Sequence, residues 1–124
     1  MFSHMMVGSN DIERSKQFYD ATFTAMGGRE GIVDPKGRLM YLHNGGAFLV
    51  TQPIDGSPAT AGNGCTVGFA MTPEQADAWH AAGVANGGTA IEDPPGERPG
   101  SGMYLAYLRD PDGNKLCALH RIQS

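Results

Sequence analysis

One pattern occurs twice in this chain, with a period of about 60 residues, and it constrains the fold more than any other feature. Each copy starts with a short apolar run, continues with a helical segment and a Gly-Gly pair, and ends with three apolar runs. The Gly-Gly pairs, at 27–28 and 87–88, supply the left-handed residue that commonly ends a helix. A four-stranded sheet with one helix leaves one face uncovered, so neither copy is expected to fold alone. The sequence therefore predicts an α+β fold of two βαβββ modules that pack together, with a cleft between them.

The first module is predicted to span residues 1–52. Asn10-Asp11 offers a helix cap, and apolar residues from Ile12 to Met26 recur at helical spacings. Two sequences, DPKG at 34–37 and NGG at 44–46, are typical of tight turns between strands. Strands are expected at residues 3–8, 30–33, 38–43 and 47–52.

Residues 53–64 carry mostly Gly, Pro, Ser, Ala and Thr and are predicted to be a linker to the second module, residues 65–124. Thr72-Pro73-Glu74-Gln75 has the pattern of a capping box with Pro at the first helical position, and this helix is expected to end near residue 86. The Pro- and Gly-rich stretch 93–102 is expected to be a loop, either a rim of the cleft or a surface connection. Strands are expected at residues 65–71, 89–92, 103–109 and 114–120.

The last two of these strands form a predicted β-hairpin around Asp110-Pro111-Asp112-Gly113, a turn in which Pro and Gly occupy favoured positions. Side chains alternate between the two faces of a strand. Leu116, Ala118 and His120 are therefore expected on one face and Lys115, Cys117 and Leu119 on the other.

Composition excludes several classes of function. The formal net charge is −4 and 18% of residues are charged, so the chain lacks the basic patch of a nucleic-acid-binding protein. No run approaches the roughly 18 apolar residues of a membrane helix, and the N-terminal stretch lacks the character of a signal peptide, so a cytoplasmic location without membrane contact is expected. Two cysteines are too few for a disulfide scaffold and are expected to be free thiols.

Two blocks at opposite ends of the chain carry a resemblance to a known family. They are His4 with residues 10–19, NDIERSKQFY, and residues 110–116, DPDGNKL. With the βαβββ repeat between them, the chain resembles the vicinal oxygen chelate superfamily, which includes glyoxalase I, extradiol dioxygenases, fosfomycin-resistance transferases and bleomycin-binding proteins. The resemblance implies one domain of two modules curled into a half-open barrel. It also implies a divalent metal held by the first and last strands of each module.

The resemblance places the four metal-ligand positions on His4, Leu49, Thr66 and Cys117, with Cys65 replacing Thr66 if the alignment shifts by one residue. A leucine cannot bind a metal, and no position carries a carboxylate. If a metal binds, His4, Cys117 and Cys65 would suit zinc, but only with Cys65 facing the cleft instead of Thr66. No metal and no other cofactor is therefore expected.

His4 and Cys117 also remain as candidate catalytic residues. His4 is either a hydrogen-bonded cleft histidine or a ligand or general base. Cys117 is either a small buried hydrophobe or a nucleophile whose thiol pKa is lowered by His4.

Aromatic strand residues are candidates for the walls of a ligand-binding cleft, together with Leu49 and Thr66. Tyr104 and Tyr107 lie an odd number of positions apart, so only one of them can face the cleft. A cleft with such walls favours flat ligands through stacking. Tyr19, Phe23 and Trp79 are expected in the core, and His43, His80 and His120 on the surface. The candidate aromatic wall residues are Tyr41, His43, Phe48, Phe69, Tyr104 and Tyr107.

Three functions follow as alternatives. The first is a homodimeric, metal-independent protein of the glyoxalase/bleomycin-resistance type that binds a small molecule in the cleft between its modules. The second is a divergent glyoxalase-type lyase or dioxygenase that uses a metal or a Cys–His pair at the same cleft. The third is a purely structural module whose cleft is filled by its own side chains.

Overall fold

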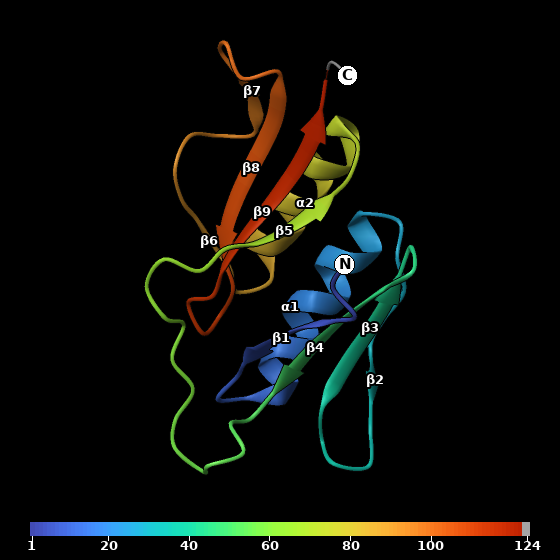
Figure 1. Cartoon of the computed structure of the whole chain (residues 1–124), viewed down its shortest axis with the longest axis vertical. Helices are drawn as coiled ribbons and strands as arrows, with labels where there is room; N and C mark the ends of the chain where they lie inside the picture. The colour runs from blue at the N-terminus through green and yellow to red at the C-terminus, as the bar shows by residue number, and fades with distance from the viewer. Residues whose placement is uncertain (123–124) are drawn as a thin grey trace.

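The computed structural model describes residues 1–122 and shows two sheets, each covered by one helix (Figure 1). The first sheet has the order β1-β4-β3-β2 and the second β5-β9-β8-β6, with β7 also paired to β8. In each sheet the strand that comes first along the chain pairs in parallel with the strand that comes last, β1 with β4 and β5 with β9. The remaining pairs are antiparallel. The elements are β1 Met5–Gly8, α1 Ile12–Ala25, β2 Ile32–Val33, β3 Leu39–His43, β4 Gly46–Thr51, β5 Val67–Ala70, α2 Pro73–Ala85, β6 Thr89–Ala90, β7 Gly96–Arg98, β8 Met103–Arg109 and β9 Lys115–Arg121. Neither sheet closes on itself, so the predicted α+β fold of two modules in a half-open arrangement is confirmed.

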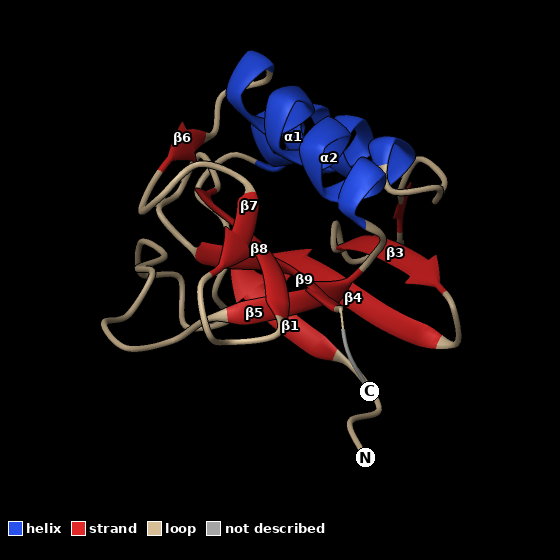
Figure 2. Ribbon diagram, turned by 90° about the horizontal axis from the view of Figure 1, so that it is seen from above, coloured by secondary structure: helices blue, strands red, loops and turns tan. Residues whose placement is uncertain are grey.

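The two helices begin and end as predicted. The Asp11 side chain accepts from the N–H of Arg14, and Thr72 and Gln75 form a complete capping box. Gly27 and Gly87 have positive φ values of 92° and 97°, which few other residues adopt without strain. Both helices lie on the same side of the strands and pack against each other, while the N-terminus lies on the other side (Figure 2).

The stretch 93–102 is more ordered than the predicted loop, because it contains β7. The sequence of β7 has no strand alternation, and its extended form comes from pairing with β8, which a local pattern cannot reveal. The Arg98 guanidinium also donates to three carbonyls of the same stretch, those of Asp93, Pro94 and Gly96, at 2.9 to 3.2 Å. β6 is shorter than predicted and ends at Ala90.

The register of the second sheet confirms the predicted alternation. Leu116 and Ala118 are fully buried on the side of the helices, and Tyr104 lies on that side too, because its hydroxyl donates to Asp77 of α2 at 2.6 Å. Tyr107 is the direct partner of Cys117 on the other face. We call the face away from the helices the outer face of each sheet.

The core lies between the helices and the sheets. Tyr19 and Trp79 are 1% exposed and Phe23 is 3% exposed, as expected from the sequence. Within residues 1–122, no helix is long and apolar enough to cross a membrane.

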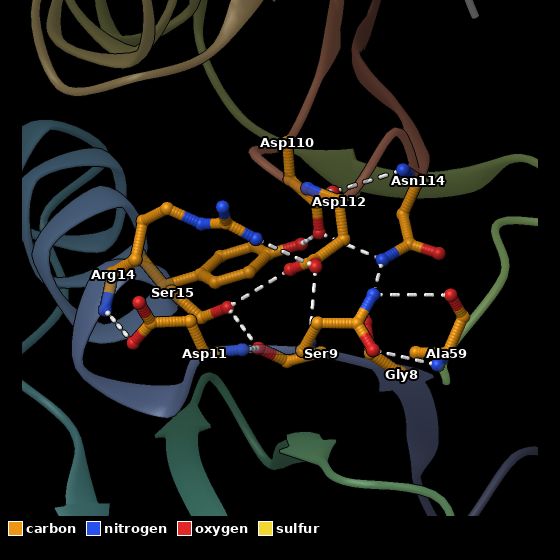
Figure 3. Close-up of polar contacts among 11 residues, drawn as sticks. Gly8, Ser9, Asp11, Arg14, Ser15, Ala59, Asp110, Asp112 and Asn114 are labelled. Atoms are coloured by element: carbon orange, nitrogen blue, oxygen red, sulfur yellow. Dashed lines mark hydrogen bonds and ion pairs between the residues drawn. The ribbon is translucent and has the colours of Figure 1, made fainter. Parts of the chain in front are cut away.

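Asp110, in the β8–β9 turn, joins the two modules through a buried hydrogen-bond network (Figure 3). Its Oδ2 accepts from the Tyr19 hydroxyl at 2.5 Å and from the Asn114 side-chain amide at 2.8 Å. Its Oδ1 accepts from the backbone N–H groups of Asp112 and Asn114, both at 2.9 Å. The Asn114 amide also donates to the Gly8 carbonyl at 3.0 Å, so the turn is fixed against β1.

Asp112 extends this network to the start of α1 (Figure 3). It accepts from the Arg14 guanidinium at 2.8 Å, the Asn10 N–H at 3.0 Å and the Ser15 hydroxyl at 3.3 Å. The Asn10 side chain exchanges two hydrogen bonds with the backbone of Ala59 in the linker. The two sequence blocks that carry the family resemblance therefore meet in space and fix the modules against each other.

Candidate functional site

A cavity of about 250 Å³ lies where the two modules meet. The first module contributes residues from β1, α1, β3 and β4, and the second contributes β5. Five of the candidate residues from the sequence line it: His4, Tyr41, His43, Phe48 and Phe69. A cavity at this junction agrees with the preference of ligand sites for interfaces between structural units.

Aromatic rings form the inner end of the cavity. The rings of Phe23 and Tyr41 are stacked, with centroids 4.4 Å apart and an interplanar angle of 6°. Phe69, from the second module, lies edge-on to Phe23 and Phe48, with ring centroids 5.5 and 5.4 Å apart. Phe23, Tyr41 and Phe48 are at most 4% exposed, whereas Phe69 is partly exposed, so Phe69 offers the most ring surface to a ligand.

Asp20 fixes the position of the Tyr41 ring. Its Oδ1 accepts from the Tyr41 hydroxyl at 2.7 Å and from the Gly31 N–H at 2.8 Å, and its Oδ2 pairs with Lys16 at 2.6 Å. Burial opposes the charge of Asp20, but these donors outweigh it and lower the pKa of Asp20. Burial and the nearby carboxylate raise the pKa of Tyr41, so its hydroxyl stays protonated and anchored.

The rim of the cavity is polar and contains two histidines. His4 shares a hydrogen bond with the Ser3 hydroxyl through Nδ1 at 2.8 Å. The Asn44 side-chain amide lies 3.1 Å from His43 Nε2. Asn44 and Gly45 have φ values of 50° and 81°, as a tight hairpin turn requires, and this turn presents His43 to the cavity.

Gly68 belongs to the lining of the cavity, and its missing side chain leaves the outer face of β5 open. A Cβ atom built on Gly68 would meet no atom within 4 Å, and the residue does not have a positive φ. The glycine is therefore not required by the backbone or by packing. Because Gly68 has no side chain, the space that a side chain would occupy stays empty.

The remaining candidate residues do not line this cavity. Leu49 pairs with Met6, and Cys117 pairs with Gly68, on the outer faces of the two sheets. Thr66 lies two positions before Gly68, so continued alternation puts Thr66, not Cys65, on the face of Cys117. Leu49 and Cys117 thus occupy equivalent places in the two modules. Tyr104 lies on the helix side and Tyr107 on the outer face.

The residues present do not fit a metal site. Within residues 1–122, no three His, Cys, Asp or Glu side chains cluster where they could hold an ion. The set His4, Cys65 and Cys117 does not assemble, because continued alternation along β5 puts Cys65 on the helix side of the second sheet, whereas Cys117 of β9 lies on its outer face. A catalytic metal usually needs three protein ligands and one open position.

Cys117 lies in surroundings that keep its thiol protonated. Burial raises the pKa of Cys117, and the hydrogen bond with Tyr107 opposes this only in part. The thiol donates to the Ala118 carbonyl at 3.5 Å, and no hydrogen bond among the described residues joins it to His4. These surroundings differ from those of reactive cysteines, whose pKa is lowered by a neighbouring cation.

Two important residues of the cavity, Phe23 and Gly68, were not among the candidates from the sequence. The helical spacing of Phe23 indicated the core, and the ring indeed belongs to the core while one part of it faces the cavity. His43, which precedes the Asn-Gly turn, was a candidate wall residue and lines the cavity. A glycine inside a predicted strand, such as Gly68, indicates open space or a close contact.

Paired βαβββ modules that leave a cavity at their junction define a class of small α+β proteins, and the comparison with known families agrees. The model of the glyoxalase/bleomycin resistance protein/dioxygenase superfamily matches residues 1–118. The chain belongs to this superfamily, as the sequence resemblance indicated.

Solved structures support the same assignment. A glyoxalase/bleomycin resistance protein from Albidiferax ferrireducens T118 is 59% identical, with a TM-score of 0.92 and coverage of 98% of this chain and 99% of that one. The fosfomycin resistance protein FosX from Listeria monocytogenes is 17% identical with a TM-score of 0.71, over 97% of this chain and 92% of that one, which shows a shared fold. FosX from Mesorhizobium loti is similar in fold, at 17% identity and a TM-score of 0.70, over 97% and 91% of the two chains. No curated protein matches the chain.

Proposed function

We propose that this protein binds a small molecule in the cavity between its two modules and does so without a divalent metal. The observation that carries the proposal is an open, aromatic-lined cavity in a chain whose inherited ligand positions hold no carboxylate. Hard divalent ions prefer oxygen ligands, and Leu49 can supply none. The cavity, in contrast, has an apolar inner end and a few polar groups at its rim, as small-molecule sites commonly do.

The relatives favour a small-molecule ligand. The similar protein from Albidiferax ferrireducens is described as a glyoxalase/bleomycin resistance protein, and the FosX proteins as fosfomycin resistance proteins. The open cavity argues against a purely structural module, whose cleft would be filled by its own side chains.

The test combines elemental analysis with thermal unfolding. Protein purified without chelator should contain far less than one equivalent of divalent metal per chain. A ligand present at about 100 times its Kd should stabilise the fold by about 2.7 kcal/mol, and excess EDTA should leave the resulting rise in Tm unchanged. One bound metal per chain, together with loss of ligand binding in EDTA, would contradict the proposal.

We also propose a homodimer in the cytoplasm. The outer face of the first sheet is strongly apolar, and Leu42, Ile32 and Met6 on it are 65%, 66% and 42% exposed in a single chain. Apolar patches of this kind commonly mark protein interfaces, and a second copy of this chain would cover the patch. Size-exclusion chromatography with light scattering tests the dimer.

A lyase or dioxygenase remains the second candidate because of one cluster on the outer face of the second sheet. Cys117 lies opposite Tyr107, and Lys115 lies 5.0 Å from the Tyr107 ring centroid and forms an ion pair with Glu92. If Cys117 has a chemical role, Cys117→Ser will abolish whatever turnover is found. Unchanged turnover in that variant would remove this candidate.

A further inference from the structure

The chemistry of the cavity wall defines the class of ligand, and this step rests on the proposed function. Among residues 1–122, no Asp, Glu, Lys or Arg lines the cavity, so none of the described side chains offers a carboxylate to a cationic ligand. The ionisable side chains in this described lining are His4, His43 and the anchored Tyr41. The ligand charge that fits such a wall is zero or negative.

The size of the cavity limits the ligand to one or two rings. A cavity of about 150 Å³ holds a benzene molecule. At about 250 Å³ the present cavity is larger than that, yet it is smaller than the roughly 300–1,000 Å³ typical of sites for drug-sized ligands. A substituted single ring or a fused pair of rings matches this volume.

The aromatic residues favour a flat ligand. The Phe23 and Tyr41 rings stack on each other, so Phe69 is the ring with surface to offer, and it projects from the other module. A flat ring can pack against the exposed part of Phe69 in the offset or edge-on geometry that aromatic pairs prefer. A puckered ring of the same volume has no π face and makes this contact less well.

The two histidines differ in what they can offer. His43 Nε2 faces the Asn44 amide, which is a donor, so Nε2 accepts and that nitrogen is occupied. His4 uses Nδ1 for the Ser3 hydroxyl. No hydrogen bond from a described residue reaches His4 Nε2, which can therefore donate to a ligand when Nδ1 accepts from Ser3.

We propose that the cavity binds a planar aromatic molecule of one or two rings that carries one hydrogen-bond acceptor, a carboxylate or carbonyl, directed at His4. The aromatic rings at the inner end select the flat part of the ligand. His4 at the rim selects the acceptor, which makes it a specificity-determining residue.

Naphthalene-2-carboxylate is the probe, and calorimetry measures its Kd with the full chain. Decahydronaphthalene-2-carboxylate, which keeps the acceptor but is not flat, should bind at least threefold more weakly. The cation 2-naphthylmethylammonium should bind about tenfold more weakly. Equal or tighter binding of either analogue would overturn the proposed ligand class.

Variants test the location and the role of His4. Phe69→Ala should weaken binding of naphthalene-2-carboxylate at least tenfold because it removes the ring against which the ligand packs. Tyr107→Ala, at an aromatic residue of the same module outside the cavity, should leave binding unchanged. His4→Ala should weaken binding of naphthalene-2-carboxylate about tenfold and leave the Kd of 2-methylnaphthalene unchanged, because only the acid has a hydrogen-bond acceptor. Equal losses for both ligands would overturn the role of His4.

The outcomes also separate this inference from the proposed function. If other small molecules bind and are weakened by Phe69→Ala while aromatic acids do not bind, only the ligand class is wrong. If no compound of a chemically mixed set binds, or if Phe69→Ala leaves all binding unchanged, the proposed function itself is wrong.

Discussion

The Tyr19 hydroxyl donates to Asp110 Oδ2 at 2.5 Å, across 91 positions of the chain and in a site where both residues are at most 3% exposed. Tyr19 lies on α1 of the first module, and Asp110 lies in the β8–β9 turn of the second. Burial raises the pKa of both groups, most strongly that of Tyr19, so the hydroxyl remains the donor. This short, charge-assisted hydrogen bond joins the two modules whose junction also forms the cavity.

Replacing Asp110 by Asn should destabilise the fold although the side chain keeps its shape. Oδ1 faces two backbone N–H groups, and Oδ2 faces the Asn114 amide, whose orientation is fixed by the Gly8 carbonyl. In either orientation the new NH₂ group would point at a donor, which should cost about 2–4 kcal/mol in urea unfolding. Asp55→Asn, at an exposed turn, is the control and should stay within about 0.5 kcal/mol. Equal effects of the two variants would contradict a structural role for the network.

Asp20→Asn should lower stability by about 0.5 kcal/mol at pH 7, because the amide oxygen can keep the bonds to Tyr41 and Gly31 while the partly exposed ion pair with Lys16 is lost. The pKa of Asp20 is lowered in the folded protein. Its charge therefore contributes stability above the ordinary carboxyl pKa of 3.8, and this contribution is lost as pH falls through the lower folded value.

The difference between Asp20→Asn and the unsubstituted protein should consequently shrink as pH falls from 7 to below 3.8. Urea unfolding at a series of pH values measures it. A difference that grows toward acid would show that the sign of the pKa shift is wrong.

The two cysteines should differ sharply toward a thiol reagent such as DTNB. Cys65 is exposed, whereas Cys117 is buried and its pKa is raised. The folded protein should release about one equivalent of chromophore quickly and a second only after denaturation, and Cys65→Ser should remove the quick phase. A fast reaction that persists in Cys65→Ser would identify Cys117 as an activated thiol and favour the enzymatic candidate.

Leu42→Glu should convert the proposed dimer to a monomer, because it places a charge in the exposed apolar face of the first sheet. Val84→Glu, on α2, is the matched control at a 49% exposed apolar residue, and it should remain dimeric. Light scattering gives the mass of each. A monomeric unsubstituted protein would rule out the dimer.

Local patterns in the sequence were sufficient for much of the fold. The caps at Asp11 and Thr72 and the Gly-Gly ends define the helices through contacts within a few residues, and period-two alternation assigned the faces of β8 and β9. β7 could not be predicted, because its extended form depends on a partner strand. The site was predictable only in part for the same reason.

Phe69 and Tyr41 were recognisable as candidate wall residues, but the alternation within one strand does not say which module covers which face. The cavity forms from side chains on β1, α1, β3, β4 and β5, so its lining depends on how the modules pack. Gly68 shows the difficulty most clearly. A glycine contributes no side chain to a pattern of alternation, and only the structure shows that the space beside Gly68 is empty.

Mapping of amide chemical shifts by NMR will show whether a small molecule binds between the modules without a metal. The unsubstituted protein would be titrated, in excess EDTA, with the compound that raises its Tm most. The largest shift changes are expected at His4, His43, Gly68 and Phe69, around the cavity between the modules. Changes centred on Tyr107 and Cys117, or changes that appear only when a divalent metal replaces the EDTA, would contradict this expectation.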